Sequence, residues 1–132
     1  MVKVGIIGLG YWGPNLVRNF NAAVGAEVAM VSDFEQERLD KICNQYPKVR
    51  GVKDGTEIIN STEIDAVVLA TPIKTHYTLA KQALNAGKHV LVEKPLTTSA
   101  EEGKELIALA ESKGKVIMVD HTFLYTGAVQ KI

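Results

Sequence analysis

Three glycines near the N-terminus have the spacing of a phosphate-binding loop. Gly8, Gly10 and Gly13 form the pattern G-x-G-x-x-G directly after an apolar segment, and Pro14 suits the first turn of a helix. The first glycine of such a loop makes a tight turn, the second leaves room for a pyrophosphate, and the third lets the helix pack closely on the strand. The free N–H groups of the helix N-terminus bind phosphate oxygens. We therefore predict a dinucleotide site; the alternative is a tight turn without a ligand.

Tyr11 and Trp12 fill the two variable positions between the second and third glycines. Two interpretations are open for these residues. In the first, their rings pack on the loop. In the second, their backbone amides meet phosphate while the rings shield the cofactor or face a partner that is missing from the chain. Both residues are included in the predicted cofactor site.

An acidic residue follows the second apolar segment at a spacing that matters for nucleotide chemistry. Asp33 lies about 20 residues beyond Gly13, where a carboxylate accepts hydrogen bonds from an adenosine ribose. The same carboxylate repels a 2′-phosphate, so we predict NAD rather than NADP. Asp33 is also in register with Gln36 for a capping box, and the two roles are compatible. Arg38 is interpreted as a solvated charge on an exposed helical face.

The elements that must position these residues alternate along the chain. Short apolar runs rich in β-branched residues predict strands, and apolar residues at helical spacing lie between them. Several runs are continuously apolar, which is typical of strands buried on both faces of a parallel sheet. Strands are expected at Val2–Ile7, Glu27–Ser32, Val49–Val52, Ala66–Ala70, His89–Val92 and Val116–Val119.

The alternation predicts an α/β fold: a doubly wound parallel sheet of Rossmann type, in three α/β/α layers, with strand order 3-2-1-4-5-6. Helix-end signals agree with this fold. Gly87 and Gly114 stand where a left-handed residue ends a helix. Ser99 and Glu102 form a capping box that opens the last long helix. Cys43 lies on the apolar stripe of the second helix and is interpreted as a buried thiol.

Length and composition limit the class of protein. The chain has 132 residues, 46% hydrophobic and 23% charged, which fits one compact folded domain. Fifteen basic and fifteen acidic residues give zero net charge, so no nucleic-acid partner is expected. The single cysteine excludes an intrachain disulfide. We also expect no signal peptide, no membrane span and no metal site. The expected location is the cytoplasm.

Two further segments follow predicted strands, at the sheet edge where open α/β sheets bind ligands. They are Thr71-Pro72, with His76 shortly after, and Glu93-Lys94-Pro95. With these segments the sequence resembles the glucose–fructose oxidoreductase, inositol dehydrogenase and MocA-like oxidoreductase family over nearly its whole length. The resemblance is carried by Gly8–Gly13, Asp33, Thr71-Pro72, His76, Ala86–Val90, Glu93–Pro95 and His121–Tyr125.

The resemblance implies a wall beside the cofactor. Thr71 and Pro72 line this wall, and His76 begins the helix behind it. Family members usually carry Asn after Thr-Pro, but Ile73 stands here, which removes one polar contact. Thr71, Pro72 and His76 are all included in the predicted cofactor site.

The resemblance also implies that Glu93, Lys94 and Pro95 border the nicotinamide, with Lys94 as the catalytic residue that reaches the substrate hydroxyl. Oxidation of a secondary alcohol needs a group that takes the hydroxyl proton or stabilises the alkoxide, and a lysine can do either. A cis Lys94–Pro95 bond would make the sharp turn that the chain needs here. His121 is a second candidate, weighed against a packing or capping role, and His89 is interpreted as structural.

Residues 1–121 are therefore expected to form the dinucleotide-binding domain. Residues 122–132 are expected to begin the segment that crosses to a substrate domain absent from this chain. The resemblance implies an oxidoreductase that moves a hydride between NAD and a sugar, sugar-nucleotide or cyclitol hydroxyl, homo-oligomeric at full length and inactive as this chain alone. A non-catalytic nucleotide-binding or regulatory module is the alternative. An S-adenosylmethionine-dependent methyltransferase would share the glycines and the acid, but Gly13 and Glu93–Pro95 argue against it.

Overall fold

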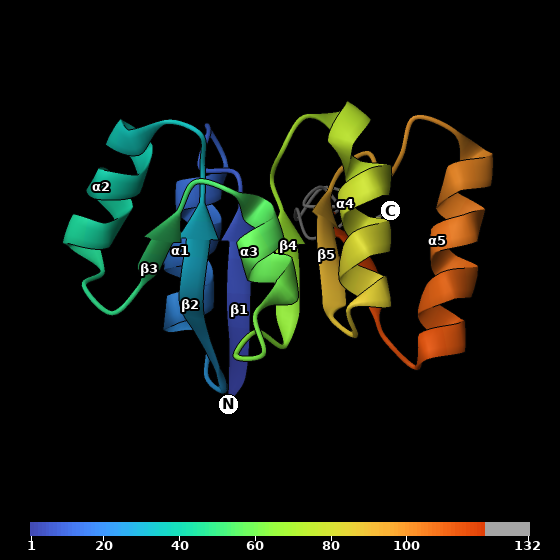
Figure 1. The fold of residues 1–132 in the computed structure, drawn as a ribbon, viewed down its shortest axis with the longest axis horizontal. Coiled ribbons are helices and arrows are strands. Elements are labelled where there is room, and N and C mark those ends of the chain that lie inside the picture. Colours follow the sequence, from blue (N-terminus) through green and yellow to red (C-terminus); the bar gives the residue numbers. More distant parts are fainter. Residues whose placement is uncertain (121–132) are drawn as a thin grey trace, which may run out of the picture.

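The computed structural model describes residues 1–120, in which six strands alternate with five helices (Figure 1). The predictions for His121 and for residues 122–132 lie outside the described residues. The strands are β1 (Val2–Ile7), β2 (Ala26–Ser32), β3 (Arg50–Val52), β4 (Ala66–Leu69), β5 (His89–Glu93) and β6 (Ile117–Asp120). The helices are α1 (Gly13–Ala22), α2 (Gln36–Gln45), α3 (Gly55–Asn60), α4 (Ile73–Asn85) and α5 (Ala100–Lys113).

The strands form one parallel sheet in the order β3-β2-β1-β4-β5-β6. This order confirms the prediction. β1 stands in the middle of the sheet, and the direction of winding reverses between β1 and β4. The carboxyl ends of all the strands therefore meet at one edge, the upper edge in Figure 1.

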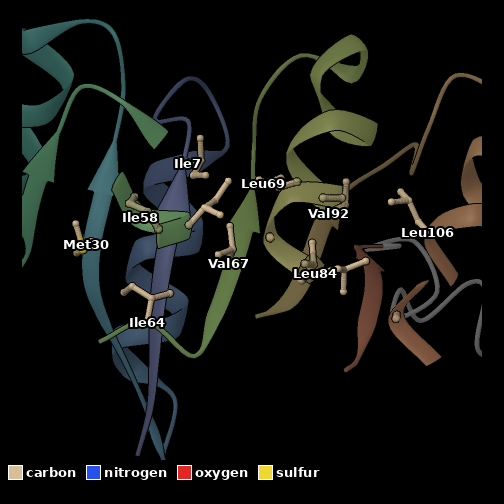
Figure 2. Close-up of a cluster of buried hydrophobic side chains, with 14 of the residues drawn as sticks. Ile7, Met30, Ile58, Ile64, Val67, Leu69, Leu84, Val92 and Leu106 are labelled. Atoms are coloured by element: carbon tan, nitrogen blue, oxygen red, sulfur yellow. The ribbon is translucent and has the colours of Figure 1, made fainter. Parts of the chain in front are cut away.

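Alternate residues of the central strand face two different layers of helices. Val4 and Ile6 of β1 belong to the core that the sheet shares with α1 and α2. Ile7 belongs to the core shared with α3, α4 and α5. Figure 1 shows α3 and α4 in front of the sheet and α1 behind it. The predicted three-layer α/β/α arrangement is therefore confirmed. Figure 2 shows the larger core, which includes Met30, Ile58, Ile64, Val67, Leu69, Leu84, Val92 and Leu106.

The helix ends follow the local chemistry that the sequence predicts. At the start of α3, Asp54 Oδ1 accepts a backbone N–H of the first turn at 2.9 Å. At the start of α5, Ser99 Oγ accepts the Glu102 backbone N–H at 3.2 Å. Gly87, with φ of +81°, follows α4, and Gly114, with φ of +65°, ends α5. Glycine adopts these left-handed angles without strain.

A buried lysine supports the segment between α3 and β4. Lys88 precedes β5, and its Nζ donates hydrogen bonds to the carbonyl oxygens of Ser61 at 2.6 Å and Ile64 at 2.7 Å. Burial lowers the pKa of the Lys88 ammonium. No local sequence pattern indicates this role of Lys88, whose side chain joins two segments far apart in the chain.

The outer strand β3 forms although it contains a glycine. A Cβ on Gly51 would lie 2.9 Å from Cys43 Sγ, so the glycine lets α2 approach the sheet. Cys43 itself is half-buried rather than fully buried, which corrects the prediction. His89 has the structural role expected of it, since its Nδ1 accepts the Val116 backbone N–H at 3.0 Å.

Two further properties concern the described part of the chain. None of the helices within residues 1–120 has the length and apolar character needed to cross a membrane. The same residues contain no group of three or more potential metal ligands.

Candidate functional site

A cleft of about 840 Å³ lies at the carboxyl ends of β1 to β4. The strand order reverses between β1 and β4, and open α/β sheets bind ligands at such a point. The connections that follow these four strands all contribute to the cleft. Its lining includes Gly8, Gly10, Asp33, Glu35, Arg38, Lys53, Asp54, Thr71, Pro72, Lys74, Thr75 and Thr78.

The three glycines of the loop lack a side chain for different reasons. Gly8 has φ of +100°, and a Cβ there would lie 2.5 Å from the Ala70 carbonyl oxygen. A Cβ on Gly13 would collide with the Gly8 carbonyl oxygen. At Gly10 the nearest atom to a Cβ would be Arg38 Nη1, 4.0 Å away. The fold itself needs Gly8 and Gly13, whereas the bare backbone at Gly10 leaves open space in the cleft that fits a pyrophosphate.

Asp33 joins two of the loops that form the cleft. Its side chain is only 8% exposed. Its Oδ2 accepts the Leu9 backbone N–H at 2.8 Å, and its Oδ1 accepts the Glu35 backbone N–H at 2.9 Å. The predicted capping box with Gln36 is wrong, because Glu35 is the N-cap residue of α2. Each carboxylate oxygen has more than one acceptor position, so the carboxylate can still receive a ribose hydroxyl.

Arg38 is exposed, as predicted, but it is also paired with two carboxylates. Its Nη1 lies 3.6 Å from Asp33 Oδ2, and its Nε lies 3.3 Å from Glu35 Oε2. The side chain is half-exposed and lines the cleft beside Gly10. The spacing of Glu35 and Arg38, three residues apart on a helical start, was the signal that could have identified this pair. A guanidinium and a carboxylate therefore lie together at one end of the cleft.

Tyr11 and Trp12 project from the glycine loop. Tyr11 is 94% exposed and Trp12 is 38% exposed. Their rings stack on each other, with centroids 6.4 Å apart and 25° between the ring planes. The exposure of Tyr11 contradicts the interpretation that its ring packs on the loop. Neither ring is part of the cleft lining described above.

Thr71 and Pro72 form the wall of the cleft after β4. Thr75 in the first turn of α4 holds this wall in place. Its Oγ1 lies 2.6 Å from the Pro72 carbonyl oxygen and 2.7 Å from Thr71 Oγ1. Ile73 begins α4 and is not among the lining residues. Lys74 adds a positive charge to the cleft that the sequence analysis did not include.

His76 lies behind this wall, in the first turns of α4. Its side chain is 1% exposed, so the ring does not reach the cleft. Nε2 lies 2.8 Å from the Thr71 carbonyl oxygen, and Nδ1 lies 2.9 Å from the Pro95 carbonyl oxygen. The ring thus spans the loops that follow β4 and β5, and any effect of His76 on a cofactor is indirect.

The segment Glu93-Lys94-Pro95 leaves the end of β5, and the Lys94–Pro95 bond is cis. None of its three residues lines the cleft of 840 Å³. The structure therefore brings the glycine loop, Asp33 and the Thr71–Pro72 wall into one cleft. It leaves the segment after β5 next to that wall, where His76 contacts it.

Glu93 faces another acid across the strand pair. It is paired in register with Asp120 of β6. Burial, and then a hydrogen bond with Asp120, raises the pKa of Glu93 to about 7, while the positive charge of Lys94 opposes the shift. Glu93 Oε1 is shielded from solvent and has no hydrogen-bond partner within residues 1–120. The sequence analysis did not include Asp120.

Comparison with known proteins identifies the family. The model of the oxidoreductase family with an NAD-binding Rossmann fold, GFO_IDH_MocA, matches residues 2–121. The chain belongs to this family. The resemblance found in the sequence is thereby confirmed, and the chain is an NAD(P)-binding Rossmann domain. The roles of the individual site residues stay predictions.

Relatives of the GFO_IDH_MocA family share this domain over most of the chain. The inositol 2-dehydrogenase of Rhodococcus erythropolis is 36% identical over 118 residues, which are 89% of this chain and 34% of the relative. Each of two crystal structures matches 98% of this chain, and the match covers 40% of the chain in that structure. Biliverdin reductase from Synechocystis, with biliverdin and NADP+, has a TM-score of 0.92 and 34% identity. A 3-ketoreductase from Actinomadura kijaniata, with NADP and TDP-benzene, has a TM-score of 0.91 and 27% identity.

Two limits follow from these family relationships. The chain spans between a third and two-fifths of the length of the relatives described above. Both structural neighbours hold NADP, so they do not support the predicted preference for NAD. Family membership establishes a nicotinamide cofactor, and the choice between NAD and NADP stays a prediction.

Proposed function

We propose that this chain is the cofactor-binding domain of an oxidoreductase that moves a hydride between a nicotinamide and the hydroxyl carbon of a cyclitol, sugar or sugar nucleotide. The observation that carries the proposal is the open space over Gly10 at the reversal of the strand order. Asp33 lies at one end of this cleft, and the Thr71–Pro72 wall lies at the other. An inositol dehydrogenase and a 3-ketoreductase with a TDP ligand among the relatives support the substrate class.

Different residues of the cleft would bind different parts of a dinucleotide. Backbone N–H groups around Gly10 and at the N-terminus of α1 would bind the pyrophosphate. Asp33 accepts the ribose hydroxyls, because its carboxylate is fixed by Leu9 and Glu35 and keeps free acceptor capacity. The bound cofactor supplies the hydride acceptor or donor.

We propose Lys94 as the residue that holds the hydroxyl proton of the substrate. A side chain that follows β5 lies at the same sheet edge as the cleft, next to the Thr71–Pro72 wall that His76 links to Pro95. A positioned ammonium or amine can donate a hydrogen bond to the developing alkoxide or take the proton. Glu93, Lys94 and Pro95 then border the nicotinamide.

We propose NAD as the preferred cofactor. The Asp33 carboxylate disfavours a 2′-phosphate, while the Arg38 guanidinium favours one, and both lie at the same end of the cleft. Asp33 is nearly buried and held by two N–H groups, whereas Arg38 is half-exposed and already paired with two carboxylates. A buried charge acts more strongly than an exposed and screened one, so the carboxylate dominates.

Titration calorimetry of this chain with NAD and NADP tests the proposal. We expect NAD to bind more tightly than NADP and no turnover of a sugar by the chain alone. Equal or tighter binding of NADP would contradict the role of Asp33 but not the dinucleotide site. Binding of neither dinucleotide would contradict the proposed function.

A non-catalytic nucleotide-binding or regulatory module is the second candidate. It is favoured by one observation: Lys94 does not line the described cleft. Restoring a domain of the relatives' length separates the two candidates, because only the oxidoreductase would reduce NAD with a cyclitol or sugar. A homo-oligomeric state and a cytoplasmic location are part of the first proposal and belong to the whole protein.

A further inference from the structure

His76 directly connects the loop after β4 with the loop after β5, and its partner Pro95 lies 19 positions further along the chain. One ring nitrogen lies 2.8 Å from the Thr71 carbonyl oxygen, and the other lies 2.9 Å from the Pro95 carbonyl oxygen. The ring is almost completely buried. The ring belongs to α4, which packs against β5 and α5 and contributes residues to the larger core.

The two contacts of the His76 ring have the same kind of partner. Both partners are carbonyl oxygens, which only accept hydrogen bonds. Each contact is therefore a hydrogen bond when that ring nitrogen carries a proton. A neutral ring donates to one carbonyl, and the imidazolium donates to both. In either form, an aliphatic or aromatic replacement removes the link and takes the ring donor away from the partly buried Thr71 carbonyl oxygen and the Pro95 carbonyl oxygen.

The loop on the Pro95 side receives one of these two contacts. Residues 94–99 lie between the end of β5 and the start of α5 and belong to neither element. The opposite loop is already held by Thr75, whose hydroxyl contacts both Thr71 and the Pro72 carbonyl oxygen. His76 thus connects the Thr71–Pro72 wall, which Thr75 also holds, with the irregular segment that contains Lys94.

We propose that His76 is a positioning residue that fixes the Lys94–Pro95 segment against the Thr71–Pro72 wall and thereby shapes the pocket for the nicotinamide half of the cofactor. This inference rests on the proposed function, which places the nicotinamide between these two loops. His76 does not touch the cofactor. It acts through the carbonyl oxygens of Thr71 and Pro95.

The test compares two ligands that differ only at the nicotinamide end. NADH and ADP-ribose share the adenosine and the pyrophosphate, and only NADH carries the nicotinamide. We expect the parent chain to bind NADH more tightly than ADP-ribose. In His76→Phe, which keeps a ring of similar size without donors, we expect NADH to lose about 3- to 10-fold in affinity, the range for one or more neutral hydrogen bonds. The affinity for ADP-ribose should change by less than about 2-fold.

Each other outcome has a definite meaning. An equal loss for both ligands, or no loss for either, would overturn the inference. A parent chain that binds ADP-ribose as tightly as NADH would contradict the placing of the nicotinamide, and a parent that binds neither would contradict the proposed function. Thr75→Val is the matched control, because it weakens the same wall without touching the link to Pro95. It should alter the ratio of the two affinities less than His76→Phe does.

A second measurement needs no folded variant. The buried ring N–H of His76 should exchange slowly with solvent and give its own resonance in nitrogen-resolved NMR spectra of the parent chain. NADH is expected to shift this resonance, and ADP-ribose is expected to leave it in place. An identical response to both ligands, or a ring N–H that exchanges at once, would overturn the inference even if His76→Phe failed to fold.

Discussion

The two ends of the candidate site differ in how completely their polar groups are satisfied. At the Asp33 end, both carboxylate oxygens accept backbone N–H groups, and Arg38 lies against them. At the end that follows β5, Glu93 faces a second acidic residue, Asp120, and one Glu93 carboxyl oxygen is buried without a partner in the described chain. A buried polar atom without a partner costs free energy. Polar groups are thus paired at the Asp33 end, whereas the end proposed for the chemistry keeps one Glu93 oxygen without a hydrogen-bond partner within residues 1–120.

The largest effect is expected for Lys94, at the end of the site that is proposed to carry out the chemistry. In a protein of the relatives' length that carries this domain, Lys94→Ala should lower kcat by roughly 10²- to 10⁴-fold, the usual span for a positioned acid–base group. The Kd for NAD should change little, because the cleft around Asp33 is untouched. Steady-state kinetics and calorimetry measure the two quantities. An unchanged kcat would reduce Lys94 to a surface charge.

Gly10→Val should break the opposite end. The branched side chain would occupy the space for the pyrophosphate, and we expect a loss in NAD affinity on the order of 100-fold, or about 2.7 kcal/mol. The fold should survive, since Gly10 does not have a positive φ and the nearest atom to its Cβ would be 4.0 Å away. Thermal melting checks the fold, and calorimetry checks the affinity.

Gly13→Val is the control for that variant. Its Cβ would collide with the Gly8 carbonyl oxygen, so it should lower the melting temperature as well as the affinity. If Gly10→Val binds NAD as the parent does, the phosphate site lies elsewhere.

Lys88→Met tests the support of the segment between α3 and β4. The change leaves the buried carbonyl oxygens of Ser61 and Ile64 without their donor, and we expect a loss of about 1–3 kcal/mol in the free energy of unfolding. Urea denaturation gives this quantity. Lys81→Met is the matched control, because Lys81 pairs with Glu105 on the surface and should matter little. Equal effects of the two variants would mean that burial of Lys88 is irrelevant to stability.

Substitutions of Asp33 and of Arg38 should change the preference between NAD and NADP in opposite directions. Arg38→Ala removes the charge that attracts a 2′-phosphate, so the ratio of NAD affinity to NADP affinity should rise by about 3- to 10-fold, as for a half-exposed charge. Asp33→Asn removes the repulsion and should lower the same ratio. Calorimetric titrations of both variants with both dinucleotides provide the four constants needed. A change of the ratio in the same direction for both variants would contradict this division of roles.

The last expected effect concerns pH and Glu93. Its pKa in the folded chain, about 7, lies above the ordinary value of 4.5, so the unfolded chain releases this proton first as the pH rises. The contribution of Glu93 to stability should therefore fall between about pH 4.5 and pH 7 and stay constant above that range. Glu93→Gln should flatten this part of the stability profile, measured by urea denaturation across the pH range. A parallel profile in the variant would contradict the assignment.

The sequence predicts the fold well because the relevant signals are local. The apolar runs, the glycine loop and the helix ends at Gly87 and Gly114 specify the elements, and right-handed crossovers then leave few possible strand orders. Even the short strand β3 follows from its position, although Gly51 weakens its local signal. Gly51 becomes understandable only when α2 places Cys43 against it.

The candidate site is predictable only where a motif carries it. The positions of Gly10, Asp33 and Thr71 in the cleft follow from spacing after strands. The partners of Asp33 do not, because its bonds to Leu9 and Glu35 depend on how two loops meet. Asp120 faces Glu93 because of the register of β5 and β6. The register between parallel strands is set by packing across the sheet, so no local sequence pattern predicts it.

The central place of β1 has a consequence for how the chain reaches its native state. β1 is synthesised first, yet its neighbour β4 begins only at Ala66, and the Lys3 backbone N–H bonds to Asp65 across 62 residues. Pairings of such long range form slowly, because the loop must close before the contacts compensate its entropy. A nascent chain that ends before β4 would leave the backbone edge of β1 that pairs with β4 exposed. Strands of other chains can pair with such an edge. Fragments that end between β3 and β4 should therefore aggregate during translation, whereas fragments that include Leu69 should have the centre of their sheet closed.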